Sequence, residues 1–253
     1  MTTSVVSGYA EQRAHRVPAT LWWACHRSPT TTILPDGCMD LIWTGESILV
    51  AGPDTGPVRY RVRGSQEMIG IRFDPGAGPA VLGVAGTELR DARVPLDEVW
   101  ARPDVERWLD AMSTGDPADV LTALARSPRT QLPRWLPAVV SGLAAGRPVD
   151  ACADMAGMST RTLHRHSLRY LGYGPKTLQR ILRMRAAAAA LRAGGDLSEV
   201  AARRGFADYA HMWRDFVDLT GRSPVDFTAA AETGATVAAA ATTTLMSDQP
   251  RAQ

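Results

Sequence analysis

Lysine, cysteine and histidine are scarce in this chain, and long apolar runs are missing. Lys176 is the single lysine among 253 residues, so nearly every cationic contact must come from arginine. The cysteines Cys25, Cys38 and Cys152 are too few and too scattered for a disulfide framework, which fits a reducing cytoplasm. No run approaches the length that spans a bilayer, and residues 1–18 contain no apolar signal segment. We therefore expect a cytoplasmic protein that does not associate with a membrane.

The patterns that mark enzymes are missing as well. The sequence has no Gly-rich phosphate loop, no nucleophile elbow and no metal-spaced cluster. A metal-dependent cupin enzyme needs several histidines and a carboxylate around one ion, yet residues 1–147 contain only His15 and His26. We expect no catalytic residue, no cofactor and no bound metal. The alternative for this region is a metal- or thiol-redox-responsive switch that uses Cys25, His26 and Cys38.

Charge is unevenly distributed along the chain. Residues 148–230 hold 12 Arg and Lys against 8 Asp and Glu, which gives +4, whereas residues 1–147 hold 15 against 16. The basic excess is a modest electrostatic sign of nucleic-acid binding. Arginine suits that role because its planar group matches phosphate and guanine edges.

The strongest local signals lie in residues 185–224. Asp196 and Glu199 form a capping-box pattern before a short amphipathic helix that ends at Gly205. Asp208 is placed to cap a second helix, which stops near Gly221. Two short helices around a glycine turn form the helix-turn-helix pattern, whose second helix enters a DNA major groove.

A second copy of this pattern lies upstream. Residues 149–157 predict a short helix that closes at glycine, and Ser159 is placed to cap a helix from Thr160 to Leu171. A long helix from Lys176 to about Ala193 then joins the two units over roughly 27 Å.

The first half of the chain alternates short apolar runs with turn residues and predicts a small antiparallel sandwich or barrel. Residues 1–18 are expected to be a loosely held lead-in. Helical spacing follows at 96–101, 104–112, 117–125 and 132–143, and Pro137 must start or kink the last of these helices. The strands are expected at 30–34, 39–44, 47–51, 58–63 and 68–73.

These patterns predict an α+β protein with a β-rich N-terminal domain, trailing helices and an all-α double helix-turn-helix module. The expected boundaries are 1–126 for a regulatory domain, 127–147 for a linker and connecting helix, 148–230 for the DNA-binding module and 231–253 for a mobile tail.

Residues 148–228 resemble the DNA-binding module of the AraC/XylS family of bacterial transcription regulators. The resemblance implies a sequence-specific DNA-binding regulator. Cys152 departs from it, because the family usually has leucine there. The matching segments are Gly157-Met-Ser-Thr-Arg-Thr-Leu-His-Arg165, Leu171-Gly-Tyr-Gly-Pro-Lys176, Gly205-Phe206 and Ser223-Pro224.

The N-terminal half is similar to an uncharacterised β-rich domain that often precedes this module. In position and pattern it is similar to a cupin-like sensor, so the resemblance suggests effector sensing but names no effector. It is carried by residues 35–42, Gly52-Pro53, residues 70–76 and residues 88–91.

DNA contacts are expected on the outward faces of the second helix in each unit, at positions that match the family's base-contacting positions. Arg183 matches a family position that is usually structural, so we expect it to pair with an acid of the second unit. The expected DNA contacts are Thr160, Arg161, His164, Arg165, Lys176, Tyr209, Ala210, Trp213 and Arg214.

Four aromatic residues of the N-terminal half, Trp22, Trp23, Trp43 and Tyr60, either line an effector pocket or form the sandwich core. The sequence leaves both interpretations open. The expected partners are double-stranded DNA at two adjacent major-groove segments, RNA polymerase, a small-molecule effector or partner protein, and a second copy of the chain.

Overall fold

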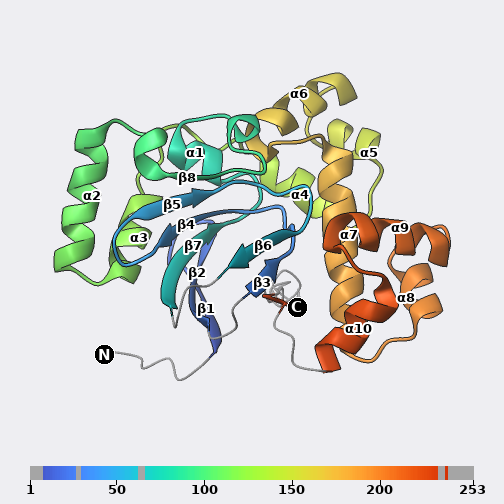
Figure 1. Ribbon diagram of the computed structural model, residues 1–253. Helices are drawn as coiled ribbons and strands as arrows, with labels where there is room; N and C mark the ends of the chain where they lie inside the picture. Colours follow the sequence, from blue (N-terminus) through green and yellow to red (C-terminus); the bar gives the residue numbers. More distant parts are fainter. Residues whose placement is uncertain (1–7, 27–29, 62–65, 233–236, 239–253) are drawn as a thin grey trace, which may run out of the picture.

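The computed structural model describes residues 8–26, 30–61, 66–232 and 237–238 (Figure 1). A β-rich N-terminal part precedes a helical C-terminal part, and each part has its own hydrophobic core. The predicted α+β architecture, with a β-rich domain followed by an all-α module, is confirmed.

Two sheets build the N-terminal part. The larger is antiparallel, in the order β1-β2-β7-β4-β5-β8. The smaller has the order β6-β3-β9, with β9 parallel to β3. The strands are β1 (Tyr9–Arg13), β2 (Ala19–His26), β3 (Thr30–Ile33), β4 (Met39–Trp43), β5 (Ile48–Ala51), β6 (Val58–Arg61), β7 (Gln66–Phe73), β8 (Arg93–Pro95) and β9 (Val237–Ala238).

The larger sheet has one apolar and one polar face, because successive strand residues point to opposite sides. Leu21, Leu41 and Ile71 lie side by side in register and are buried in the N-terminal core. Asp40 and Arg72 occupy the alternate positions and face the other way. The helices and 3₁₀ turns of this part are α1 (Gly78–Leu82), η1 (Gly86–Glu88), η2 (Leu96–Glu98), α2 (Arg102–Thr114) and α3 (Pro117–Ala125).

The structure corrects three sequence-based expectations. Residues 9–13, expected to be part of a loose lead-in, form β1 because the edge of β2 offers a row of backbone groups for pairing. Residues 93–95, directly before the first expected helix, form an additional strand, β8, which pairs with β5. The helix expected at 96–101 is only the 3₁₀ turn η2.

Seven helices follow in the described C-terminal part, and α7 runs between the others as a single 18-residue rod. Pro137 lies in the first turn of α4 and so starts that helix, where its missing N–H is harmless. The helices are α4 (Leu136–Ala144), α5 (Val149–Met155), α6 (Thr160–Leu171), α7 (Pro175–Arg192), α8 (Leu197–Arg203), α9 (Tyr209–Thr220) and α10 (Pro224–Glu232).

The predicted helix caps are confirmed. Ser159 accepts a hydrogen bond from the Thr162 N–H at the start of α6, and Asp208 accepts one from the His211 N–H at the start of α9. Asp196 caps α8 in the same way. In the expected capping box the Glu199 side chain would reach back to Asp196. Glu199 instead forms an ion pair with Arg203 at 2.6 Å.

Of the expected tail, residues 231–253, the structure describes only the end of α10 and the strand β9. Within the described ranges, no helix combines the length and apolar character that a bilayer crossing requires.

Candidate functional site

The outward face of α6 carries four of the predicted DNA contacts. Thr160, Arg161, His164 and Arg165 are all exposed, and their spacing places them on one side of the helix. Leu163, Ser167 and Leu171 are buried on the opposite side, which packs into the helical core. The amphipathic pattern therefore fixes which side of α6 is available to a partner.

The outward face of α9 repeats this arrangement. Tyr209, Ala210, Trp213 and Arg214 are exposed, while Met212 and Phe216 are buried opposite them. Trp213 is 43% exposed and Tyr209 is 38% exposed, which places two large aromatic side chains together on a polar surface. The exposed face of α9 therefore combines aromatic side chains with the charged Arg214.

The nine predicted DNA contacts thus fall into three groups. Four lie on α6, four lie at the matching positions of α9, and Lys176 is exposed in the first turn of α7. The structure brings the members of each group together on one helix. We call α6 and α9 the recognition helices.

A network of charged side chains fixes α9 against α7. Arg183 pairs with Asp215 at 2.6 Å, as expected from the sequence, and Arg180 pairs with the same carboxylate at 2.8 Å. Arg180 also reaches Asp218 at 3.0 Å. His211 accepts a hydrogen bond from the Ala207 N–H through Nδ1, at 3.2 Å. His211 therefore holds the turn before α9.

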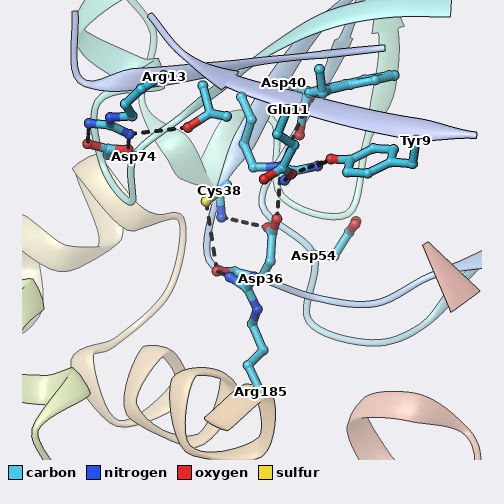
Figure 2. Close-up of polar contacts among 12 residues, drawn as sticks. Tyr9, Glu11, Arg13, Asp36, Cys38, Asp40, Asp54, Asp74 and Arg185 are labelled. Carbon is cyan, nitrogen blue, oxygen red and sulfur yellow. Dashed lines mark hydrogen bonds and ion pairs between the residues drawn. The ribbon is translucent and has the colours of Figure 1, made fainter. Parts of the chain in front are cut away.

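A second cluster of charged side chains lies on the polar face of the larger sheet, where Figure 2 shows Glu11, Asp36 and Asp40 close together. The cluster centres on Arg72. Arg72 pairs with Glu11 at 2.8 Å, with Asp36 at 3.1 Å and with Asp40 at 3.5 Å. The indole N–H of Trp22 donates to Asp40 at 2.6 Å. Burial raises the pKa of Asp40 to about 6, although the Arg72 charge acts in the opposite direction.

This polar cluster is connected to the helical module. The guanidinium of Arg185, on α7, donates to the backbone carbonyl of Asp36 at 3.1 Å (Figure 2). Next to it, a Cβ added to Gly37 would lie 2.7 Å from Leu178 Cδ1, so the turn packs directly on α7. Asp36 therefore contacts Arg72 with its side chain and Arg185 of the helical C-terminal part with its backbone carbonyl.

The sequence alone does not mark Asp36, Asp40 and Arg72 as a site. The available signal was a charged residue within a largely apolar strand, as for Asp40 within Met39–Trp43 and Arg72 within Gln66–Phe73. The pairing of β4 with β7, which places Asp40 opposite Arg72, could not be predicted from the sequence.

The structure does not bring the four candidate pocket aromatics together. Trp22 is buried on the polar face, where a Cβ on Gly70 would lie 2.3 Å from its ring. Trp23 and Trp43 pack on the opposite face, against the N-terminal core. Tyr60 belongs to β6 of the smaller sheet.

The candidates for a metal- or thiol-redox-responsive switch are Cys25, His26 and Cys38. Cys38 is buried and its N–H donates to the Asp36 carboxylate at 2.9 Å, so it is part of a turn. Burial raises the pKa of the Cys38 thiol and disfavours the reactive thiolate. Cys25 is half-buried, and the side chain of His26 lies outside the described residues. Among the described side chains, no group of three or more His, Cys, Asp and Glu is placed to hold a metal ion.

Comparison with known protein families gives two matches. Residues 152–230 match a family described as a helix-turn-helix domain, and residues 19–95 match a domain of unknown function. None of the curated proteins compared with the chain matches it.

A comparison with solved structures finds similar chains at low sequence identity. A probable AraC family transcriptional regulator from Rhodopseudomonas palustris is 24% identical, with a TM-score of 0.36 over 39% of this chain and 98% of its own. ToxT from Vibrio cholerae is 9% identical, with a TM-score of 0.44 over 83% of this chain and 97% of its own. ToxT bound to an unsaturated fatty acid is 10% identical, with a TM-score of 0.39 over 87% of this chain and 90% of its own.

The family match covers both helix-turn-helix units and the long helix between them. It confirms the resemblance that the sequence motifs indicated for this region. Residues 152–230 thus belong to a family of helix-turn-helix domains, and residues 19–95 belong to a family of unknown function.

Proposed function

We propose that the protein is a sequence-specific DNA-binding transcription regulator that covers two adjacent major-groove segments with one chain. The observation that carries this proposal is the repeated exposed face on α6 and α9, at the same helical positions and on one connected module. Recognition helices of helix-turn-helix proteins lie in the major groove. A single chain with two such helices meets two successive segments of the duplex.

The exposed side chains supply both kinds of contact that DNA recognition needs. Arg165 and Arg214 have the chemistry to pair with guanine edges, and Trp213 and Ala210 to contact thymine methyl groups. Lys176 supplies a point charge for phosphate, which strengthens binding to any sequence. No catalytic step is part of this proposal, and the protein acts in the cytoplasm beside the DNA.

The N-terminal domain controls this activity through a small molecule or a partner protein. Support comes from Asp36, which links the buried Arg72 cluster to Arg185 of α7. A ligand that binds one arrangement of this contact better than another shifts the population of the protein that is competent to bind DNA or RNA polymerase.

Selection of duplexes from a random-sequence pool by the full chain tests DNA recognition. We expect an enriched motif of two segments, and loss of enrichment when Arg161→Ala and Arg214→Ala are combined. Arg102→Ala is the matched control, because Arg102 is exposed on α2 of the N-terminal part. Enrichment of no motif, or an identical motif from the double variant, contradicts the proposal.

A thermal-shift screen of metabolites against the full chain tests ligand control. A ligand that binds only the folded protein stabilises it by about 2.7 kcal/mol at 100-fold excess over its dissociation constant. Each hit is then added to the DNA-binding assay, where we expect a change in affinity. Stoichiometric zinc or iron whose removal by a chelator unfolds the protein contradicts control by a metal-free domain.

A further inference from the structure

The loop between β5 and β6, residues 52–57, contacts the C-terminal ends of both recognition helices. A Cβ added to Gly172, the left-handed C-cap of α6, would lie 2.6 Å from Pro53 Cγ. A Cβ added to Gly221, the left-handed C-cap of α9, would lie 3.5 Å from Pro57 Cγ. Figure 1 shows the loop on the side of the N-terminal part that faces α7 and α9.

Several hydrogen bonds hold this loop in place. Arg93 donates to both carboxylate oxygens of the buried Asp54, at 2.7 and 2.5 Å. The N–H of Thr55 donates to the Asp91 carboxylate at 2.7 Å, and the N–H of Asp91 donates to the Pro53 carbonyl at 3.2 Å. These bonds anchor the loop to the segment around β8, so it is part of the N-terminal domain.

The neighbouring turn η1 packs on the same point of α6. A Cβ on Gly86 would lie 2.6 Å from the Gly172 nitrogen, and Arg90 donates to the Gly172 carbonyl at 3.5 Å. The loop and this segment are themselves in contact, since a Cβ on Gly52 would lie 1.6 Å from the Leu89 carbonyl oxygen. Both elements thus meet the end of α6 as one unit.

The connection between α6 and α7 also rests on the N-terminal domain. Tyr173 lies in this connection between two glycines and is only 3% exposed. Its hydroxyl would lie 3.8 Å from a Cβ on Gly37, at the turn that packs on α7. Because α9 is fixed to α7 by the Asp215 ion pairs, the angle between the two recognition helices depends on this connection.

We propose that Pro53 and Pro57 are positioning residues for DNA recognition. Through them the 52–57 loop sets the placement of α6 relative to α9, and so the spacing between the two DNA segments that the chain prefers. This inference rests on the proposed DNA-binding function. The N-terminal domain thus determines which spacing between the two DNA segments the protein prefers, whereas the exposed faces of α6 and α9 determine the base preference.

The test compares the full-length wild type with a Pro53→Ala/Pro57→Ala double variant on DNA. The probe is a duplex selected by the wild type, together with versions that have one base pair added or removed between the segments and a version with one segment. We expect the double variant to lose about 10-fold in affinity for the selected duplex, since the helices are no longer pre-positioned. Its discrimination between spacings should shrink by a similar factor, and its binding to one segment should be unchanged.

Matched variants separate positioning from damage to the fold. Pro103→Ala removes an exposed proline from α2 and should behave like the wild type. Thr55→Val leaves both prolines in place and removes only the hydroxyl bonds to Asp91. It should shift the spacing profile in the same direction as the double variant. If the double variant does not fold, Thr55→Val takes its place in the test.

Three outcomes count against the inference. If the wild type prefers no duplex, the proposed function fails and the inference fails with it. If the wild type binds and the double variant keeps its spacing preference, only the inference fails. An equal loss on one-segment and two-segment duplexes also overturns it, because positioning acts only when both segments are bound.

Discussion

Arg183 of α7 and Asp215 of α9 form an ion pair at 2.6 Å whose acid is only 5% exposed. Arg180 pairs with the same carboxylate from the preceding turn of α7. This one acid therefore joins the second recognition helix to the rod that carries it.

Asp215→Asn should destabilise the protein by about 2–4 kcal/mol, because two guanidinium groups lose a buried partner. Chemical unfolding of the full chain measures this. Asp218→Asn is the matched control, since Asp218 pairs with Arg180 but its side chain is 63% exposed, and its loss should cost about 0–1 kcal/mol. Equal losses for the two variants contradict the structural role given to Asp215.

Arg165→Ala and Arg214→Ala should each weaken binding to the selected duplex by about 1–3 kcal/mol and relax the preference at one base position. The reason is that each arginine lies on the exposed face of a recognition helix. Equilibrium binding to the selected and to random duplexes checks this. Equal losses on both duplexes show that the arginine contacts phosphate instead.

Lys176→Ala should weaken binding to all sequences alike, because an exposed lysine in the first turn of α7 offers a phosphate contact without base specificity. The slope of log affinity against log salt should become shallower by about one unit. Binding measured across a salt series gives this slope. A changed base preference, with an unchanged slope, argues against a phosphate contact.

Asp40→Asn should change how stability depends on pH. The pKa of Asp40 is raised from 3.8 to about 6 by burial, so the folded protein holds this proton more tightly than the unfolded chain. The contribution of Asp40 to the free energy of unfolding therefore rises as pH falls from about 6 to about 4, and is least favourable above that window.

Asparagine removes this dependence and retains an oxygen that accepts from the Trp22 indole N–H. At pH 7.5 the free energy of unfolding of the variant should exceed that of the wild type by on the order of 2 kcal/mol, and this difference should disappear near pH 4. Urea unfolding across this pH range measures the difference. A difference that stays constant with pH contradicts the assignment.

Local sequence signals were sufficient to predict the helices of the C-terminal part. They did not predict the contacts between these helices and the N-terminal part. Ser159 and Asp208 mark the starts of their helices because a cap depends on residues only a few positions away. The contact between Arg185 and Asp36 joins residues 149 positions apart, and neither segment carries a local sign of the other. The same holds for Pro57 beside Gly221.

The missed β1 strand has a similar cause. Residues 9–13 are largely polar and lack the alternation of an amphipathic strand, so their state is decided by pairing with β2. The polar cluster depends on this pairing too, because Glu11 reaches Arg72 from β1. The candidate DNA-contact face could be proposed from periodicity and resemblance, whereas the polar cluster required the three-dimensional arrangement of strands.

The central claim is that one chain contacts two adjacent major-groove segments through two different helices. Hydroxyl-radical footprinting of the full chain on a selected duplex, with complex stoichiometry measured in parallel, tests it most directly. We predict one chain per site and an asymmetric footprint with two protected segments about one DNA turn, ~34 Å, apart. Arg165→Ala should weaken protection of one segment and Arg214→Ala that of the other. A palindromic footprint occupied by two chains, each protecting a single segment, would contradict the account.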